Sequence, residues 1–186
     1  MRERGQTVIG IARASIEKAL GAAARVDLAG APWLREHGSS FVTLRRDGDL
    51  RGCIGSLEAW RPLGVDIAEN AVAAALHDRR FPPVEMTELA LLEVEVSLLT
   101  PSEPLPCADE ADALRKLRPG IDGVVIEFGH HRATFLPQVW ENLPDAPIFL
   151  RELKLKAGLP DSFWHPDLRV RRYGVEKHCE WRSHNE

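Results

Sequence analysis

A short turn between two strand-like runs limits the folds open to this chain more than any other feature of its sequence. Residues 40–46 and 50–55 flank Asp47-Gly48-Asp49, and the glycine of such a turn readily adopts a positive φ. The two runs are therefore expected to pair as an antiparallel β-hairpin. Residues 123–128 and 132–136 repeat the pattern around another glycine and predict a second hairpin.

Segments of helical periodicity lie between these strands. In residues 7–22 and 63–77, apolar side chains recur at three- and four-residue steps, as on the buried face of an amphipathic helix. The second helix must end before Pro82-Pro83, because proline lacks the N–H that a helix needs. The sequence also predicts shorter elements, namely helices over 108–117 and 148–157 and strands over 93–98 and 168–175.

The order of these elements favours one fold class. Helices and hairpins are mixed without regular βαβ units, so we expect an α+β fold in which a mixed or antiparallel sheet has flanking helices. A chain of 186 residues is near the size of one domain, about 150 residues. One domain spanning residues 1–186 is the simplest organisation, and a smaller lobe that makes two subdomains stays open.

Charge and cysteine content exclude several classes of protein. The chain has 24 Lys and Arg against 28 Asp and Glu, a net charge of −4, whereas nucleic-acid binding needs a basic surplus. Three cysteines without a Cys-x-x-Cys pair indicate a reducing cytoplasm rather than a disulfide-rich secreted scaffold. The longest aliphatic run, residues 71–76, is far shorter than the about 20 residues of a membrane span. A soluble protein is expected.

Motifs for common cofactors and metals are missing from the sequence. It has no phosphate-binding loop, no Gly-x-Gly-x-x-Gly after a strand, no Gly-x-Ser-x-Gly and no His-Glu-x-x-His. The histidines lack the spacing of a zinc site, and His178, Cys179 and His184 fall in a segment expected to be a mobile tail. Neither a metal nor a cofactor is predicted.

The segment Leu50-Arg51-Gly52-Cys53-Ile54-Gly55 is unusual for a strand, because strand interiors normally avoid glycine and this one has two. If the run is extended, Arg51, Cys53 and Gly55 share one face. A guanidinium near a cysteine lowers the pKa of the thiol and favours the thiolate, which is the nucleophile and the metal ligand. Cys53 is thus a candidate reactive residue. The alternative is a buried cysteine that only fills space.

Residues near the end of the second predicted helix are candidates to complete a site around Cys53. His77 is the nearest histidine beyond the hairpin and is a candidate base, although a cation is also favoured at a helix C-terminus for structural reasons. Arg80 and Phe81 precede the stiff Pro82-Pro83 pair, which suits a pocket wall or a plain connector.

Charge is unevenly distributed along the chain. Residues 85–112 contain acids but no Lys or Arg, whereas residues 151–177 are mildly basic. A solvated surface explains such runs. The alternative is an anionic partner for Arg169, Arg171 and Arg172.

These motifs resemble those of a known family, the AmmeMemoRadiSam system protein A family, which is the prokaryotic form of the AMMECR-type domain. Its hallmark hexapeptide stands intact at residues 50–55, preceded by Phe41-Val42-Thr43-Leu44 and the Asp-Gly turn. Asp78-Arg79-Arg80-Phe81-Pro82-Pro83 is similar to the family's Arg-Phe-Pro-Pro segment, and the similarity covers about residues 7–176.

The resemblance implies more about the fold than about the chemistry. It implies an α+β fold with a larger sheet-containing part, a smaller lobe and the hexapeptide near a cleft between them. It also implies an association with a Memo-type dioxygenase-like protein and a radical S-adenosylmethionine enzyme. No settled reaction for this component follows from it.

We therefore expect a cytoplasmic protein whose candidate catalytic residues are Cys53 and Arg51. The candidate ligand-binding residues are Gly52, Gly55, Arg80 and Phe81. The expected ligand is a small anion held by Arg51 and Arg80, with Cys53 as nucleophile or ligand. The alternative is a non-catalytic adaptor that uses the same cleft to dock a partner protein, so whether the chain is an enzyme stays open.

Overall fold

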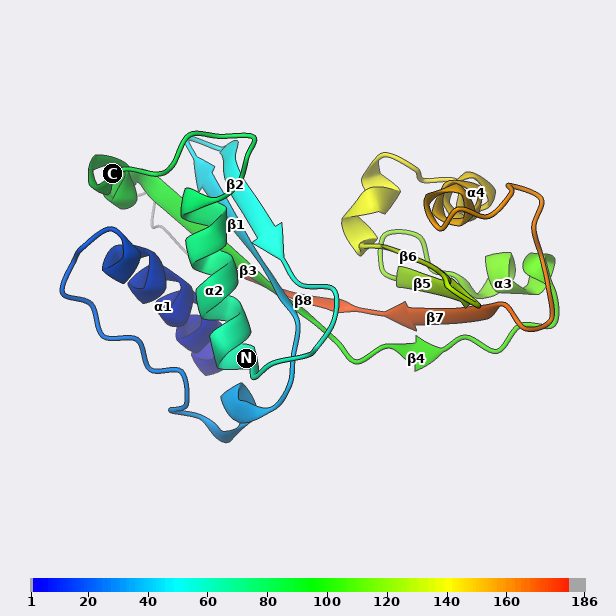
Figure 1. The fold of residues 1–186 in the computed structure, drawn as a ribbon, viewed down its shortest axis with the longest axis horizontal. Helices are drawn as coiled ribbons and strands as arrows, with labels where there is room; N and C mark the ends of the chain where they lie inside the picture. The colour runs from blue at the N-terminus through cyan, green and yellow to red at the C-terminus, as the bar shows by residue number, and fades with distance from the viewer. Residues whose placement is uncertain (1, 181–186) are drawn as a thin grey trace. The chain divides into compact units, whose positions relative to one another are not determined.

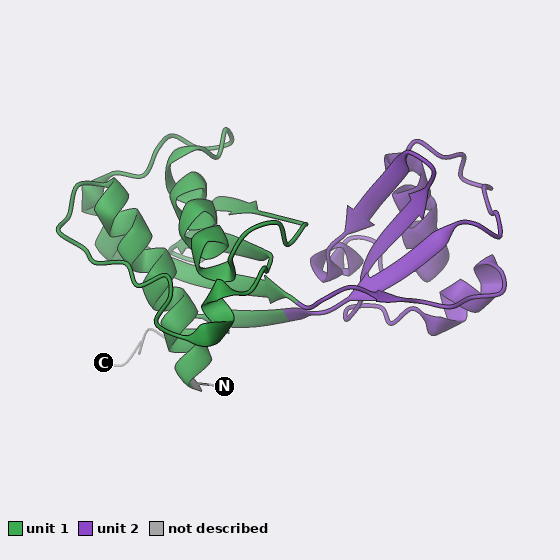
Figure 2. Cartoon of the chain, turned by 60° about the horizontal axis from the view of Figure 1, so that its bottom comes forward, with its two compact units in different colours: residues 1–99, 176–186 green, residues 100–175 purple. Residues whose placement is uncertain are grey.

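The computed structural model describes residues 2–180, which form two compact units (Figure 2). Among these residues, unit 1 comprises 2–99 and 176–180, and unit 2 comprises 100–175, so unit 2 is an insertion in the chain of unit 1. Each unit has its own four-stranded sheet and its own cluster of buried apolar side chains. The expected α+β class is confirmed.

Unit 1 packs two helices against one sheet. Its elements are α1 (Arg2–Ala19), the 3₁₀ helix η1 (Pro32–Arg35), β1 (Ser40–Arg46), β2 (Asp49–Gly55), α2 (Leu63–Leu76), the 3₁₀ helix η2 (Met86–Leu91), β3 (Leu92–Leu99) and β8 (Val175–Cys179). The strand order is β2-β1-β3-β8. Helices α1 and α2 lie next to each other against this sheet (Figure 1).

Unit 2 has a second sheet with helices of its own. Its elements are β4 (Glu103–Pro104), α3 (Glu110–Lys116), β5 (Gly123–Phe128), β6 (His131–Phe135), the 3₁₀ helix η3 (Pro137–Glu141), α4 (Ala146–Lys156) and β7 (Arg169–Tyr173). The strand order is β4-β7-β5-β6. No helix within residues 2–180 combines the length and the apolar character needed to cross a membrane.

Both hairpins that the sequence predicts are confirmed. β1 pairs with β2 around Asp47 and Gly48, whose φ angles of 53° and 85° are both positive, as the favoured two-residue hairpin turn requires. β5 pairs with β6 around Gly129, where φ is 59°. In each turn a glycine allows the left-handed backbone at no steric cost.

The hairpin β1–β2 is irregular at the hexapeptide. The register shifts by one residue, so that Leu44 lies opposite Gly52 and Thr43 lies opposite Cys53, while Arg51 has no direct partner. Such a β-bulge bends a strand and redirects its side chains. The regular alternation expected from Arg51 to Cys53 is therefore interrupted at Arg51.

Gly52 allows α2 to approach the sheet closely. Val42 and Leu44 of β1 are fully buried in the core, and a Cβ on Gly52 would lie 2.1 Å from the carbonyl oxygen of Ala74 in α2. Real Cβ atoms do not come so close to an oxygen. Gly52 thus faces the helices and, because side chains alternate along a strand, Cys53 faces the opposite side of the sheet.

The C-terminal strand differs from the sequence prediction. Instead of one strand over 168–175, the chain forms β7 in unit 2 and then β8, which is the neighbour of β3. Gly174 separates them, and its N–H donates to Thr100 Oγ1 at 2.7 Å. His178 and Cys179 lie within β8 rather than in a mobile tail, because this strand completes the sheet of unit 1. His184 lies outside the described residues.

Replacing Gly52 tests the close approach of α2. Gly52→Ala is expected to lower the free energy of unfolding by about 1–3 kcal/mol, because the new methyl group must push α2 away from β2. Urea unfolding followed by circular dichroism measures the change. Gly10→Ala in α1 is the control, since a Cβ there meets nothing within 4 Å. A Gly52→Ala protein as stable as the wild type would contradict the packing described.

Candidate functional site

Cys53 lies in the middle of β2 with its sulfur on the sheet face away from α2. Its side chain is half-buried, and the thiol is free. Thr43 is its neighbour on β1, and the Thr43 hydroxyl donates to Cys53 Sγ at 3.3 Å. A hydrogen bond of this kind favours the charged form of the group that accepts it. Thr43 thus supplies a hydrogen-bond donor to the sulfur.

Two side chains from the segment after α2 close the outer edge of β2. Because β2 is an edge strand, the outward backbone groups of Cys53 have no strand beside them. Asp78 Oδ2 accepts from the Cys53 N–H at 2.9 Å, and Arg80 Nη2 donates to the Cys53 carbonyl oxygen at 3.1 Å. Asp78 and Arg80 thus take the place of a neighbouring strand.

Asp78 and Arg80 also bind each other. Arg80 Nε and Nη2 donate to the two Asp78 carboxylate oxygens at 2.9 and 2.6 Å. Hydrogen bonding to Arg80 is the main cause that holds the pKa of Asp78 far below its ordinary value, and the Cys53 N–H adds to it, although burial opposes the shift.

The same pair raises the pKa of Arg80, mainly through Asp78, with smaller contributions from the Cys53 side chain. The Arg80 guanidinium is therefore permanently charged and interacts with Cys53. Since 56% of the Arg80 side chain is exposed, this cation is also open to solvent.

Arg51 has a different set of partners. Its Nε and Nη2 donate to the Glu88 carboxylate at 3.0 and 2.9 Å, and Nη1 donates to the carbonyl oxygen of Pro82 at 2.9 Å. The hydrogen bonds from Arg51 to the Glu88 carboxylate are the main reason that the pKa of Glu88 is lowered to about 2. Only 13% of the Arg51 side chain is exposed. Its hydrogen bonds hold the proline turn against η2, and none of them goes to Cys53.

Of the other expected ligand-binding residues, Phe81 lies beside Arg80, whereas Gly52 and Gly55 pack against other parts of unit 1. Gly55 packs against the ring of Phe41, which a Cβ on Gly55 would approach to 2.2 Å. Phe81 is half-buried, and the guanidinium carbon of Arg80 lies 5.5 Å from its ring centroid, within range of a cation–π contact. Gly52 faces α2 and is thus on the side of the sheet opposite the sulfur.

His77 does not join this site. It is the exposed residue at the C-terminal end of α2, and it lines a groove between α1 and α2 together with Ser15 and Lys18. Among the described residues, no hydrogen bond joins His77 to Cys53. Within residues 2–180, no group of three His, Cys, Asp or Glu side chains is arranged to hold a metal ion.

The structure thus brings Cys53, Thr43, Asp78 and Arg80 together. Sequence reasoning did not assign Thr43 or Asp78 to the site. For Asp78 a signal existed, because it is the one acid between the expected end of the helix and Pro82-Pro83 and stands two residues before Arg80. For Thr43 the signal was absent, since its place opposite Cys53 depends on the bulge.

Comparison with known proteins decides the family. The model of the AMMECR1 family matches residues 9–178. This chain belongs to the AMMECR1 family. The resemblance carried by the hexapeptide is therefore confirmed, and the match spans both units of the AMMECR1 chain.

Relatives of this AMMECR1 protein align with it over most of their length. A protein from Methanothermobacter thermautotrophicus is 42% identical over 183 residues, which cover 94% of this chain and 93% of the relative. Protein MJ0810 from Methanocaldococcus jannaschii is 39% identical, with 87% and 82% covered. The crystal structure of uncharacterized protein PH0010 from Pyrococcus horikoshii matches with a TM-score of 0.77 at 36% identity, covering 94% of this chain and 90% of that one.

Glu88 is expected to make the stability of this AMMECR1 protein depend on pH. The folded chain holds the pKa of Glu88 at about 2 instead of 4.5, so the carboxylate contributes stability above pH 4.5 that is lost as the pH falls toward 2. Glu88→Gln should therefore be less stable than the wild type at neutral pH, with a difference that shrinks in acid. Urea unfolding over a pH series measures this difference.

Glu141→Gln is the control for this pH series. Glu141 is exposed and has no ion pair among the described residues, so its removal should change stability little at any pH. A deficit in Glu88→Gln that stays constant from neutral pH into acid would show that the Arg51–Glu88 contact is not the source.

Proposed function

We propose that this AMMECR1 protein uses Cys53 as a thiolate that reacts with, or ligates, a small anionic substrate held by Arg80. The observation that carries the proposal is the position of the Arg80 guanidinium. Asp78 fixes it against the Cys53 backbone, and more than half of the Arg80 side chain still faces solvent. Asp78 balances the charge of this guanidinium, and Arg80 Nη1, which has no hydrogen bond among the described residues, is the donor left for a thiolate or an anion.

The neighbouring side chains have supporting roles in this proposal. Thr43 supplies a second donor to the sulfur, and Phe81 gives the ligand an apolar surface beside the guanidinium. Arg51 is largely buried and already bound to Glu88. It therefore acts on the ligand indirectly, by positioning the turn that carries Arg80 and Phe81.

Gly52 and Gly55 act through the backbone alone. Any side chain at Gly52 would strike α2, and any side chain at Gly55 would strike the Phe41 ring. They contribute to ligand binding indirectly, because they let β2 pack closely against α2 and the Phe41 ring. This packing keeps the Cys53 sulfur on the outer face of the sheet.

The proposed chemistry does not depend on a Cys-His pair. His77 lies in the groove between α1 and α2, so the Cys53 proton leaves to solvent rather than to a base. The Thr43 hydroxyl donates to the sulfur, whereas Arg80 donates to the Cys53 carbonyl oxygen and acts on the sulfur through its charge. A free thiol of this kind functions in a reducing compartment, and we propose the cytoplasm.

The family resemblance supplies the proposed partners. A Memo-type protein and a radical S-adenosylmethionine enzyme are the proteins with which we expect this chain to act. A small anion that passes between them and Cys53 would require a binding site and one reactive group here, which is what the arrangement around Arg80 offers.

Alkylation by two reagents of different charge tests the proposal. Iodoacetate and iodoacetamide both transfer a methylene carbon to a thiolate and release iodide, but only iodoacetate is an anion. The measured quantity is the ratio of the alkylation rate with iodoacetate to the rate with iodoacetamide. This ratio should be about two- to fivefold higher at Cys53 than at Cys107, which is the effect expected of a partly exposed cation. Mass spectrometry of the modified peptides measures each cysteine separately.

Variants of Arg80 and Arg79 show whether the effect comes from the Arg80 guanidinium or from the overall charge of the protein. Arg80→Gln should bring the ratio at Cys53 down to that at Cys107, and Arg80→Lys should keep most of it because the charge remains. Arg79→Gln is the matched control, since Arg79 is exposed and adjacent in the chain. Equal ratios at Cys53 and Cys107 in the wild-type protein would end the proposal.

A second candidate function is that of an adaptor that binds a partner protein. The observation in its favour is the loop after β2, where Leu57 and Trp60 keep 46% and 64% of their surface exposed. Exposed large apolar side chains of this kind are common in protein interfaces. Trp60 also stacks with the guanidinium of Arg61 at 4.6 Å, which holds its ring in place.

Cys53→Ser distinguishes the two candidate functions. Oxygen in place of sulfur removes thiolate chemistry and preserves most of the shape, so full activity of the assembled system with Cys53→Ser would favour the adaptor. Partner binding that is retained while turnover is lost would favour the thiolate. Trp60→Ala should weaken partner binding by about tenfold or more if the adaptor function holds, as loss of a central aromatic residue typically does.

A further inference from the structure

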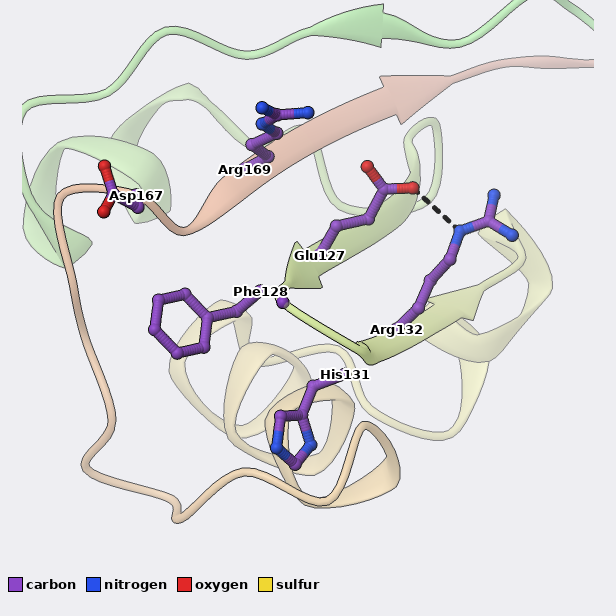
Figure 3. Close-up of a pocket in the computed structure, with 7 residues that line it drawn as sticks. Glu127, Phe128, His131, Arg132, Asp167 and Arg169 are labelled. Carbon is purple, nitrogen blue, oxygen red and sulfur yellow. Dashed lines mark hydrogen bonds and ion pairs between the residues drawn. The ribbon is translucent and has the colours of Figure 1, made fainter.

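A pocket of about 640 Å³ lies in unit 2 at the tip of the β5–β6 hairpin and the start of β7 (Figure 3). This volume is within the range of small-molecule sites, roughly 300–1,000 Å³. Its lining residues are Glu127, Phe128, Gly129, His131, Arg132, Asp167 and Arg169. All of them belong to unit 2, and Cys53 is not among them.

Three charged side chains form a row across the sheet at this pocket. Glu127 on β5 lies opposite Arg132 on β6 and opposite Arg169 on β7. The Glu127 carboxylate accepts from Arg132 Nε at 2.8 Å (Figure 3). Glu127 and Arg132 thus neutralise each other within the row.

Arg169 is the cation of this row that is left without a partner. Its side chain is exposed and, within residues 2–180, makes no hydrogen bond or ion pair. The two arginines that follow are engaged, since Arg171 donates to Ser102 and Arg172 to Glu103. Of the three arginines expected to face solvent or bind an anion, Arg169 is the one that the pocket offers to a ligand.

Asp167 supplies the matching anion. Its backbone N–H donates to His165 Nδ1 at 3.1 Å, and its carboxylate lies 3.6 Å from the same nitrogen. The carboxylate keeps 84% of the side chain exposed. One cation and one anion, two residues apart, therefore remain open at the rim of the pocket.

Phe128 bounds the pocket at the tip of the hairpin. Phe128 is half-buried, and its ring packs against the rings of Phe163 and His165, with centroids 4.9 and 5.1 Å away. These contacts hold the ring in a fixed orientation. The ring thus lies on the face of the sheet opposite the row of Glu127, Arg132 and Arg169 (Figure 3), and the two open charges are what the pocket offers to a ligand.

We propose that this pocket binds a small zwitterion of the α-amino acid class. Arg169 receives the carboxylate through a guanidinium, whose paired N–H groups match a carboxylate's geometry. Asp167 receives the ammonium group. A ligand with one charge satisfies one open group and is repelled by the other, so the balance of charges selects a zwitterion.

Three ligands that share one phenyl ring test the proposal. L-phenylalanine carries both charges, 3-phenylpropanoate carries the carboxylate alone, and 2-phenylethylamine carries the ammonium alone. Titration of the full-length ¹⁵N-labelled protein should show saturable shifts of the Gly129 and His131 amides with L-phenylalanine. Each single-charge analogue should bind at least about fivefold more weakly, the factor of one partly exposed ion pair.

Charge-neutral variants of the two exposed residues identify the groups. Arg169→Gln should reduce L-phenylalanine binding to the level of 2-phenylethylamine, and Asp167→Asn should reduce it to the level of 3-phenylpropanoate. Asp161→Asn and Cys53→Ser are controls that should leave binding unchanged, because neither residue lines the pocket. Binding to Cys53→Ser also separates this inference from the proposed function.

Two results would overturn the inference. The first is that either single-charge analogue binds as tightly as L-phenylalanine, because the pocket would then recognise only one of the two charges. Absence of amide shifts at Gly129 and His131 with L-phenylalanine would show that the pocket does not take this class of ligand.

Discussion

The arrangement around Cys53 depends on the carboxylate of Asp78. This side chain is 6% exposed, and it accepts hydrogen bonds from the Cys53 N–H and from the Arg80 backbone and guanidinium. A buried carboxylate is costly unless it is paired and hydrogen-bonded. Here Arg80 supplies the paired charge, and the Cys53 N–H at the edge of β2 supplies a further hydrogen bond. Cys53 and Arg80 are consequently held in fixed positions relative to each other.

This constraint divides the hexapeptide into residues with different tasks. Gly52 and Gly55 leave space for α2 and for the Phe41 ring, and Arg51 holds the proline turn. Each of these tasks is accounted for by packing or by a hydrogen bond within unit 1. The sulfur of Cys53 has one hydrogen bond, from a hydroxyl, and partial exposure. Packing alone therefore explains the cysteine least well, which is why the proposed function centres on it.

Local patterns predict the elements of this fold better than they predict the site. Hairpins and amphipathic helices follow from turn residues and apolar spacing, which are short-range features. A regular ladder from the turn would place Thr43 opposite Gly52, whereas the bulge at Arg51 places it opposite Cys53. Arg51 binds Glu88, 37 residues further along the chain. No local pattern contains such a contact, so the sequence could not predict that Arg51 binds Glu88 instead of lying beside Cys53.

The insertion of unit 2 explains how one chain can hold two separate candidate sites. Strands β3 and β8 are neighbours in unit 1 although the whole of unit 2 lies between them in sequence. At the base of the insertion, the Thr100 N–H donates to the Gly174 carbonyl oxygen at 2.9 Å, and the Gly174 N–H donates to Thr100 Oγ1. These two bonds bring the ends of the insertion together. They offset part of the conformational entropy that is lost when the two ends of unit 2 are held side by side. Cys53 and Arg169 then belong to different sheets and different cores, and the ligand of one need not be the ligand of the other.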